Sequence, residues 1–150
     1  MYHFFVRRTF HNMFQQLSAG NWQYAVTRMA PVFEHTFAGE HCLGGTRHTI
    51  ESFRRWFERL YRLFPNLQFE IHHVAVSGWP WDTTAVAEWT DRATPKDGQP
   101  YVNRGVHVVR LRWGRVVSLH AYLDTRLVTE TCRRLAEQGI EEAAAAPIVD

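Results

Sequence analysis

The stretch from Tyr101 to Asp124 constrains the fold of this chain most, because it has the pattern of two β-strands joined by a tight turn. Valine and leucine alternate with polar residues on both sides of Trp113-Gly114, and glycine tolerates the backbone of a two-residue turn. With that turn, pairing outward places His107 opposite His120. The sequence therefore predicts an antiparallel hairpin here.

One face of this hairpin has the composition of a pocket wall. Alternate side chains of a strand point the same way, and paired positions share a face. The predicted face combines apolar residues with two imidazoles, a phenol, an amide and a carboxylate: Asn103, His107, Val109, Leu111, Val116, Ser118, His120, Tyr122 and Asp124. A one-residue error in the turn would change the cross-strand partners, and a bulge would change the grouping within a strand.

Length and composition exclude several classes of protein. A chain of 150 residues fits one domain, and its 10 Phe, 6 Trp and 5 Tyr predict a core or pocket lined by rings. The 17 basic and 15 acidic residues form no separate basic patch, so no nucleic-acid partner is expected. No apolar run approaches the ~20 residues of a membrane span, which predicts a soluble, cytoplasmic protein without a membrane partner. Cys42 and Cys132 indicate neither a zinc site nor a disulfide framework.

Four helical patterns are present along the chain. Apolar residues recur at helical spacing from Phe4 to Leu17, and a second helix is predicted from Asn21, as its N-cap, until Pro31. Thr49 caps a strong amphipathic helix that Pro65 terminates. Helical spacing returns after Asp124 and ends at Gly139.

The remaining patterns are strands. Residues 32–37 alternate, with Phe33, His35 and Phe37 on one side, and strands are predicted at 67–76 and 83–94. The Asp97-Gly98 turn makes 83–109 a second hairpin. Its pocket side carries either Glu88, Thr90 and Arg92 or Trp89 and Asp91, and the sequence leaves both open. A single domain over 1–150 is expected, with a core at about 4–137 and a loosely held segment at 138–150.

The order of these elements resembles the nuclear transport factor 2-like superfamily, and within it the SnoaL-like proteins, which include polyketide cyclases and are related to ketosteroid isomerases. The resemblance covers about residues 4–137. It depends most on four motifs: Phe53-x-x-Trp56-Phe57 leading to Phe64-Pro65, Asn103-Arg104-Gly105-Val106-His107, Trp113-Gly114-Arg115-Val116 and Tyr122-Leu123-Asp124-Thr125.

The resemblance implies an α+β fold: a cone-shaped, curved, mixed and mostly antiparallel sheet packed against the N-terminal helices and a long helix. The interior of such a cone is apolar, and members of the family are usually homodimers through the outer face of the sheet. A small hydrophobic molecule is the implied partner, and no cofactor or metal is needed.

The resemblance also implies an acid/base pair. By strand and face, Asp124 matches the family's catalytic Asp and His107 its catalytic His, which supports a cofactor-independent isomerase or cyclase that moves a proton next to a carbonyl group. Asp124 would act as the base, because an apolar pocket raises the pKa of a carboxyl group. The remaining candidates would contact the substrate: Tyr122, His120, Asn103, His35, Trp22, Trp56 and Trp89.

Several alternatives remain open on the sequence. Asp124 can instead cap the last helix by accepting hydrogen bonds from the amides of Leu127 or Val128. The protein can bind a small hydrophobic ligand without catalysis, or serve only in protein assembly. A metal site from His107, His120, His35 and Asp124, or a carboxylate-Arg-carboxylate set from Glu88, Arg92 and Asp124 like that of related epoxide hydrolases, requires these side chains to converge.

Overall fold

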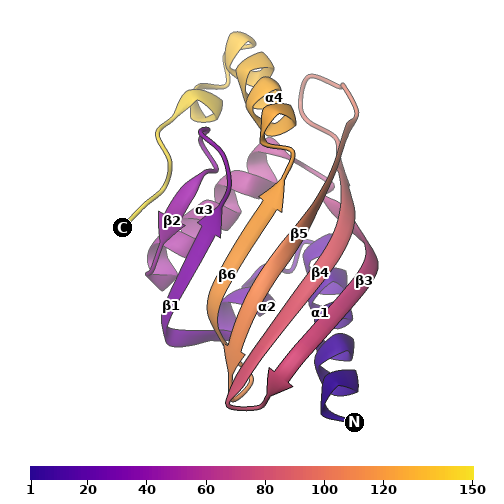
Figure 1. The fold of residues 1–150 in the computed structure, drawn as a ribbon. Coiled ribbons are helices and arrows are strands. Elements are labelled where there is room, and N and C mark those ends of the chain that lie inside the picture. The colour runs from indigo at the N-terminus through magenta and orange to yellow at the C-terminus, as the bar shows by residue number, and fades with distance from the viewer.

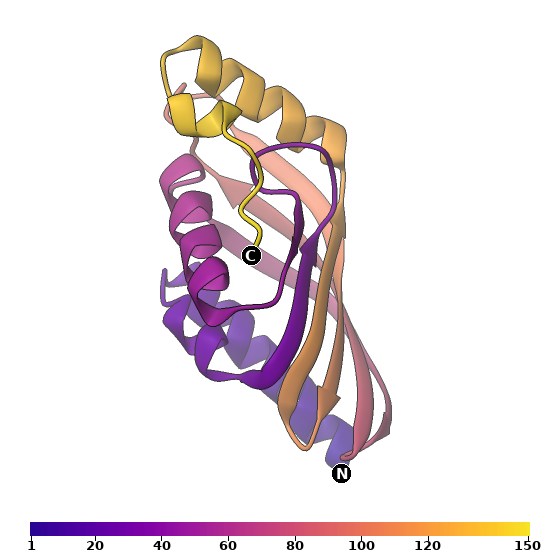
Figure 2. The same ribbon diagram turned by 90° about the vertical axis from the view of Figure 1, so that its left-hand side faces the viewer.

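The computed structural model describes all 150 residues and shows one curved six-stranded sheet with helices against its concave face (Figures 1 and 2). The strand order is β2-β1-β6-β5-β4-β3, and every neighbouring pair is antiparallel except β1 and β6. The predicted α+β class with a mixed, mostly antiparallel sheet is confirmed. The strands are β1 Met29–Phe37, β2 Gly45–Arg47, β3 Gln68–Trp79, β4 Asp82–Ala93, β5 Tyr101–Arg112 and β6 Arg115–Leu123.

The helices follow from local sequence, with one correction. They are α1 Tyr2–Ser18, α2 Gln23–Thr27, α3 Ile50–Leu63, α4 Thr125–Glu137 and the short 3-10 helix η1 Glu141–Ala144. Thr49 caps α3 as predicted, since its hydroxyl oxygen accepts from the Ser52 amide at 3.1 Å. The predicted cap of the second helix is wrong: the side chain of Asn21 donates to Gln16, and Pro31 lies within β1.

The turn between β5 and β6 is confirmed, but a β-bulge follows it. Trp113 and Gly114 have φ angles of 50° and 75°, as a type I′ turn requires. Leu111 pairs with Val116 and Arg110 with Ser118, so Val117 is an extra residue in β6. Beyond the bulge His107 pairs with Ala121 and His120 with Val108, which corrects the predicted pairing of the two histidines.

The segment after α4 is not loosely held. It runs from α4 past η1 and back along α3 to the β1–β2 edge of the sheet (Figure 2). Ala143 and Ile148 are buried, and the backbone carbonyl of Ile148 accepts a hydrogen bond from the side chain of Arg47 at 2.8 Å. The expectation for 138–150 is therefore wrong, because apolar and polar contacts both fix this segment.

None of the helices is long and apolar enough to span a membrane.

Candidate functional site

An apolar cavity lies between the concave face of the sheet and the helices α1, α2 and α3. Its volume is about 100 Å³, and 23 of its 28 lining residues are hydrophobic. Burial of polar groups in such a lining is costly unless they are hydrogen-bonded, so the exceptions are informative. The five lining residues that are not hydrophobic are Thr9, Arg28, His35, Asp91 and His107.

Asp91 on β4 presents an unpartnered carboxylate oxygen to this cavity. The residue is 6% exposed, and its Oδ1 atom is buried without a hydrogen-bond partner. Burial raises the pKa of Asp91 to about 7, although amides of Asn103 and of Asp91 itself partly oppose the shift. The carboxyl group therefore exchanges its proton near neutral pH, unlike an ordinary aspartate.

The alternation of β4 resolves which of its faces lines the cavity. Trp89 and Asp91 point inward, whereas Glu88 is exposed and Arg92 forms an ion pair with Glu70 on the convex face at 3.1 Å. The carboxylate-Arg-carboxylate site considered from the sequence, with Glu88, Arg92 and Asp124, is therefore not formed. The register with Trp89 and Asp91 inside is the one that the structure adopts.

Tyr101 on β5 also lines the cavity, and its phenol interacts with the charge of Asp91. Its oxygen accepts a hydrogen bond from the side chain of Asn103 at 2.9 Å, so its own proton is free to be donated. Burial and, next, the charge of Asp91 raise the pKa of Tyr101, which keeps the phenol neutral.

His107 on β5 is held as one neutral tautomer. The indole N–H of Trp89 donates to His107 Nδ1 at 2.7 Å, and an indole nitrogen can only donate. A neutral ring must then carry its proton on Nε2, which has no partner within the protein. Burial lowers the pKa of His107 to about 4, so the ring is uncharged at pH 7.

A glycine makes this pairing possible. Gly105 stands opposite Trp89, and a Cβ atom there would lie 2.9 Å from the indole ring. Glycine in a strand permits such a close approach of a ring to the backbone. The small residue thus lets Trp89 reach across the sheet to His107.

His35 on β1 has the same protonation state for a different reason. Arg47 Nη1 lies 2.6 Å from His35 Nδ1, and a guanidinium group can only donate. Burial, followed by the charge of Arg47, lowers the pKa of His35 well below its ordinary value. Two neutral rings with protons on Nε2 therefore belong to one cavity wall.

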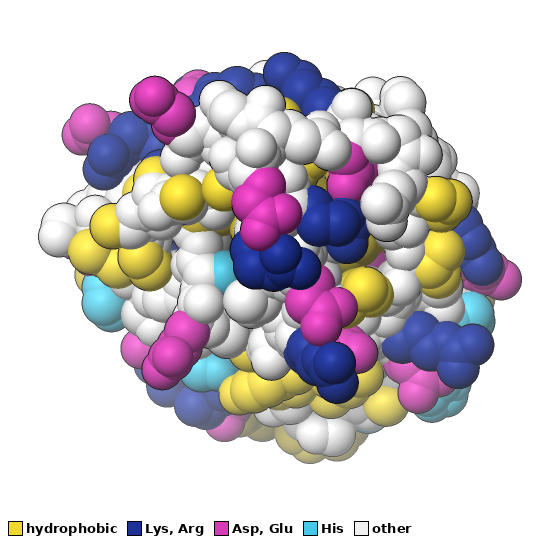
Figure 3. Space-filling view, turned by 90° about the horizontal axis from the view of Figure 1, so that it is seen from above, with side chains coloured by type: hydrophobic (Ala, Val, Ile, Leu, Met, Phe, Trp, Pro, Cys, Tyr) yellow, Lys and Arg dark blue, Asp and Glu magenta, His cyan; other side chains and the backbone are white.

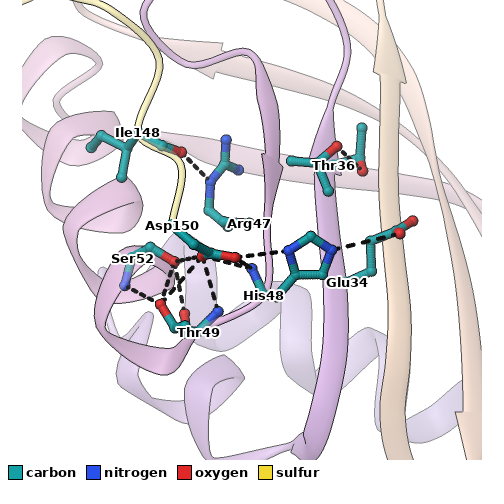
Figure 4. Close-up of polar contacts among 9 residues, drawn as sticks. Glu34, Thr36, Arg47, His48, Thr49, Ser52, Ile148 and Asp150 are labelled. Atoms are coloured by element: carbon teal, nitrogen blue, oxygen red, sulfur yellow. Dashed lines mark hydrogen bonds and ion pairs between the residues drawn. The ribbon is translucent and has the colours of Figure 1, made fainter.

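Arg47 is wholly buried and has no carboxylate partner. Besides His35, its guanidinium donates to the carbonyl oxygens of Gly44 and Ile148, both at 2.8 Å, and lies over the ring of Trp56 at 5.5 Å. Burial lowers its pKa to about 10. The bond to Ile148, visible in Figure 4, ties the segment after α4 to the residue that orients His35.

Asp150 anchors that segment at the N-terminus of α3 (Figure 4). Its carboxylate accepts from the amide of His48 at 2.9 Å, from that of Thr49 at 3.2 Å and from the hydroxyl of Ser52 at 2.8 Å. These hydrogen bonds hold the pKa of Asp150 below its ordinary range. The segment thus has a polar anchor two residues beyond the Ile148 carbonyl.

Asp124, predicted as the base, lies outside the cavity. It is exposed, and its Oδ1 accepts from the amides of Arg126 at 3.1 Å and Leu127 at 3.3 Å as the N-cap of α4. The carboxylate is thus occupied by helix amides, as the capping alternative required. The assignment of Asp124 as the base is wrong.

Two predicted contact residues lie on the convex face because of the bulge in β6. His120 Nε2 binds Glu34 at 2.7 Å, and the other ring nitrogen binds the Tyr122 hydroxyl at 3.1 Å. Neither residue lines the cavity, and His120 is therefore separated from His35 and His107 by the sheet. The predicted metal set is not brought together.

Asn103 and Trp22 are also outside the cavity lining. Asn103 is buried, and its side chain amide donates to the backbone carbonyl of Asp124 at 3.0 Å, which fixes the start of α4. Trp22 stacks on Phe57 with ring centroids 5.4 Å apart. Both positions are structural in this arrangement.

Four predicted site residues do line the cavity: His35, Trp56, Trp89 and His107. Sequence reasoning left Asp91 undecided and missed Arg47 and Tyr101. One signal was present for Asp91. Glu88 and Arg92 point to the opposite face of the same strand, and a face with two charged side chains is expected to meet solvent. No comparable signal pointed to Arg47, whose partners lie far away in the sequence.

Comparison with known proteins agrees with this fold. A protein of unknown function from Burkholderia pseudomallei, described as NTF2-like, is 20% identical with a TM-score of 0.74 over 83% of this chain and 95% of that one. A proposed SnoaL-like polyketide cyclase from a Jannaschia species is 20% identical, with a TM-score of 0.64 over 84% and 89%. TerC, crystallised with polyporic acid, is 15% identical, with a TM-score of 0.65 over 79% and 91%.

At these identities the solved structures show a shared fold and nothing finer. None of the curated proteins matches the chain. The model of the SnoaL-like domain family, however, matches residues 10–119, which is more than half of the sequence. The chain therefore belongs to the SnoaL-like domain family.

Proposed function

We propose that the chain binds a small hydrophobic carbonyl compound in the cavity and that Asp91 moves a proton at a carbon next to the carbonyl group. The observation that supports this most is the buried, unpartnered Oδ1 of Asp91 in an otherwise apolar lining. With a pKa of about 7, Asp91 is a stronger base than an ordinary aspartate and still loses its proton at neutral pH. No cofactor is required for this step.

A neutral donor completes the proposed chemistry. Removing a proton next to a carbonyl places negative charge on the carbonyl oxygen, which preorganised N–H and O–H groups stabilise. Tyr101, whose pKa burial and the charge of Asp91 raise, presents its hydroxyl proton for this role. The Nε2 protons of His35 and His107 are too far along the sheet from Asp91 to serve the same oxygen. Because Tyr101 stays neutral near pH 7, it donates without competing for the transferred proton.

The spacing of these groups suggests the size of the substrate. On β4, His107 pairs with Ala87, four residues from Asp91, which corresponds to about 13 Å along the strand. A compound with a single small ring reaches the carboxylate or the imidazoles but not both. A cavity of about 100 Å³ is smaller than the ~150 Å³ that holds benzene, so the proposed substrate is a small uncharged ketone with its carbonyl group at the Asp91 end.

Binding without catalysis is the second candidate. An apolar lining of 23 residues around a cavity supports retention of a hydrophobic ligand whether or not a proton moves. In that case Asp91 would serve only to accept or donate a hydrogen bond. Exchange of ligand protons with solvent separates the two functions.

Hydrogen exchange between ligand and solvent distinguishes Asp91 from Asp124 as the base. The wild type is expected to incorporate solvent deuterium next to the carbonyl group of small cyclic ketones. In Asp91→Asn the rate should fall by about 100-fold or more, since a general base contributes 10²–10⁴-fold. The wild-type rate should rise with pH through about 7, as Asp91 loses its proton. NMR or mass spectrometry measures the exchange.

Asp124→Asn is the matched control for this experiment. It removes a carboxylate that caps α4 and should leave the exchange rate unchanged. Exchange that survives in Asp91→Asn, or is lost only in Asp124→Asn, contradicts the assignment of the base. Tight ligand binding with no exchange in any variant supports the noncatalytic function instead.

We also propose a homodimer through the convex face of the sheet. No helix covers this face (Figure 2), and it exposes Val102 and Tyr122. Light scattering at low micromolar concentration is expected to give about 35 kDa, twice the 17.6 kDa of one chain. Adding a charge with Tyr122→Glu should shift the mass toward the monomer, whereas a wild-type monomer would rule the interface out.

A further inference from the structure

Three exposed tryptophans gather at the end of the sheet opposite α4. Trp79 ends β3, Trp81 lies in the β3–β4 turn and Trp113 lies in the β5–β6 turn; they are 61%, 56% and 72% exposed. Their ring centroids are 6.2 Å apart for Trp79 and Trp81 and 6.3 Å apart for Trp81 and Trp113. The amide of Trp113 donates to the carbonyl of Pro80 at 2.6 Å, so the two turns are tied together.

The first turn of α1 adds two phenyl rings to this end of the molecule. The N-terminus lies beside the two strand turns (Figures 1 and 2), where His3 Nε2 binds the carbonyl of Gly78 at 2.8 Å. Phe4 and Phe5 on the same turn are both more than half exposed. The aromatic end is defined here by Phe4, Phe5, Trp79, Trp81 and Trp113.

Unpaired positive charge surrounds the aromatic end. The first 33 residues contain no Asp or Glu, and Asp82 is the only acidic residue of the two turns. Asp82 is already paired with Arg110 at 3.0 Å. Four further exposed arginines at this end have no carboxylate partner: Arg7, Arg8, Arg112 and Arg115.

The opposite end of the molecule is built differently. Seen from above, basic and acidic side chains are interspersed around α4 (Figure 3). Their ion pairs are Arg126 with Glu130, Arg133 with Glu137 and Arg134 with Asp97. The three exposed tryptophans therefore all lie at the end of the sheet away from these ion pairs.

We infer that the aromatic end is a docking surface for an anionic lipid bilayer. Indole rings favour the boundary between lipid headgroups and acyl chains, phenyl rings favour the apolar side of it, and arginines attract anionic headgroups. The surface consists of protruding turns rather than a groove, which suits a soft bilayer. Peripheral docking needs no membrane-spanning run, so it revises the expectation of no membrane partner.

Self-association at this surface is disfavoured by charge. A two-fold dimer would bring the same patch of each copy together, so that two surfaces with unpaired arginines would face each other. Docking at this surface does not depend on proton transfer by Asp91. It does connect to the cavity, because Leu111 and Val116, next to the β5–β6 turn, also line it.

The test is co-sedimentation with phosphatidylcholine vesicles that contain either no phosphatidylserine or about one third phosphatidylserine. Wild type is expected to bind the anionic vesicles at least tenfold more tightly, to lose this preference at high salt and to show a blue shift of tryptophan fluorescence. Trp81→Ser with Trp113→Ser should reduce binding tenfold or more. Arg112→Glu with Arg115→Glu should abolish the preference for anionic lipid.

Arg126→Glu with Arg133→Glu is the matched control, because it makes the same change of charge on α4 and should leave binding unchanged. If the α4 variant weakens vesicle binding equally, the net charge of the protein explains the binding, and the inference is overturned. Absence of binding to anionic vesicles at low salt also overturns it. So does binding of a single-stranded oligonucleotide without binding of vesicles, or a dimer that only the tryptophan variant disrupts.

Discussion

The difference in unfolding free energy between Asp91→Asn and the wild type is expected to grow by about 2–3 kcal/mol, in favour of the variant, as pH rises from 5 to 8. The Asp91 carboxyl has an ordinary pKa of 3.8 and a folded pKa of about 7. Between these values the folded chain keeps a proton that the unfolded chain has lost. The free energy of unfolding therefore falls by about 1.4 kcal/mol per pH unit as pH rises in this window.

The histidines of the cavity change stability with pH in the opposite direction, but their effect cancels when the variant is compared with the wild type. The pKa values of His35 and His107 are lowered on folding, so their contribution to stability is lost as pH falls below 6.5. Both proteins contain these histidines, and the difference between them isolates Asp91. A variant that is more stable at pH 8 and less active would indicate a carboxylate kept for function.

Denaturant unfolding at several pH values measures this effect. Asp97→Asn is the control, because Arg134 lowers the pKa of Asp97 and its contribution is already complete at pH 5. The difference between that variant and the wild type should stay constant from pH 5 to pH 8. A constant difference for Asp91→Asn as well would mean that its carboxyl group is not perturbed by folding.

Arg47→Met is expected to lower the free energy of unfolding by about 3–5 kcal/mol. Methionine replaces the aliphatic part of the arginine side chain but leaves three buried acceptors without a donor: His35 Nδ1 and the carbonyl oxygens of Gly44 and Ile148. Each unsatisfied buried group costs about 1–3 kcal/mol, and the removal of a buried charge offsets part of the sum. Loss of the Ile148 contact also releases the segment after α4.

Two further measurements show whether this loss has the stated cause. Arg92→Met removes an arginine whose ion pair with Glu70 is exposed, and it should cost less than about 1 kcal/mol. In Arg47→Met the nitrogen-15 shifts of His35 should report loss of the fixed tautomer, which general destabilisation would not produce. A cost below 1 kcal/mol with an unchanged tautomer would contradict the role of Arg47.

The sequence predicted the elements of the fold well because its signals are local. The Trp113-Gly114 turn, the Thr49 cap and the alternation around His35 depend on neighbouring residues, and all three are confirmed. The bulge at Val117 has no such signal, since valine fits either strand geometry. That one extra residue moved His120 and Tyr122 from the predicted pocket wall to the convex face.

The site itself was predictable only in part. The alternation along β5 placed His107 on the cavity face. The choice of Asp91 over Glu88, however, required the register between β4 and β5, which a long connection between residues 93 and 101 leaves undetermined in the sequence. The link from Asp150 and Ile148 to Arg47 and His35 spans about a hundred positions, and no periodicity encodes it. Asp124 was misassigned because a carboxylate at a strand end serves a helix cap as well as a catalytic site.

The measurement that tests the central claim most directly is a carbon-13 NMR titration of aspartate carboxyl groups in the wild type and in Asp91→Asn. It needs no knowledge of the substrate. The expected result is one carboxyl resonance with a midpoint of about 7 that is missing from the variant. If every aspartate of the wild type titrates below pH 5, Asp91 is an ordinary carboxylate and cannot be the base proposed for this cavity.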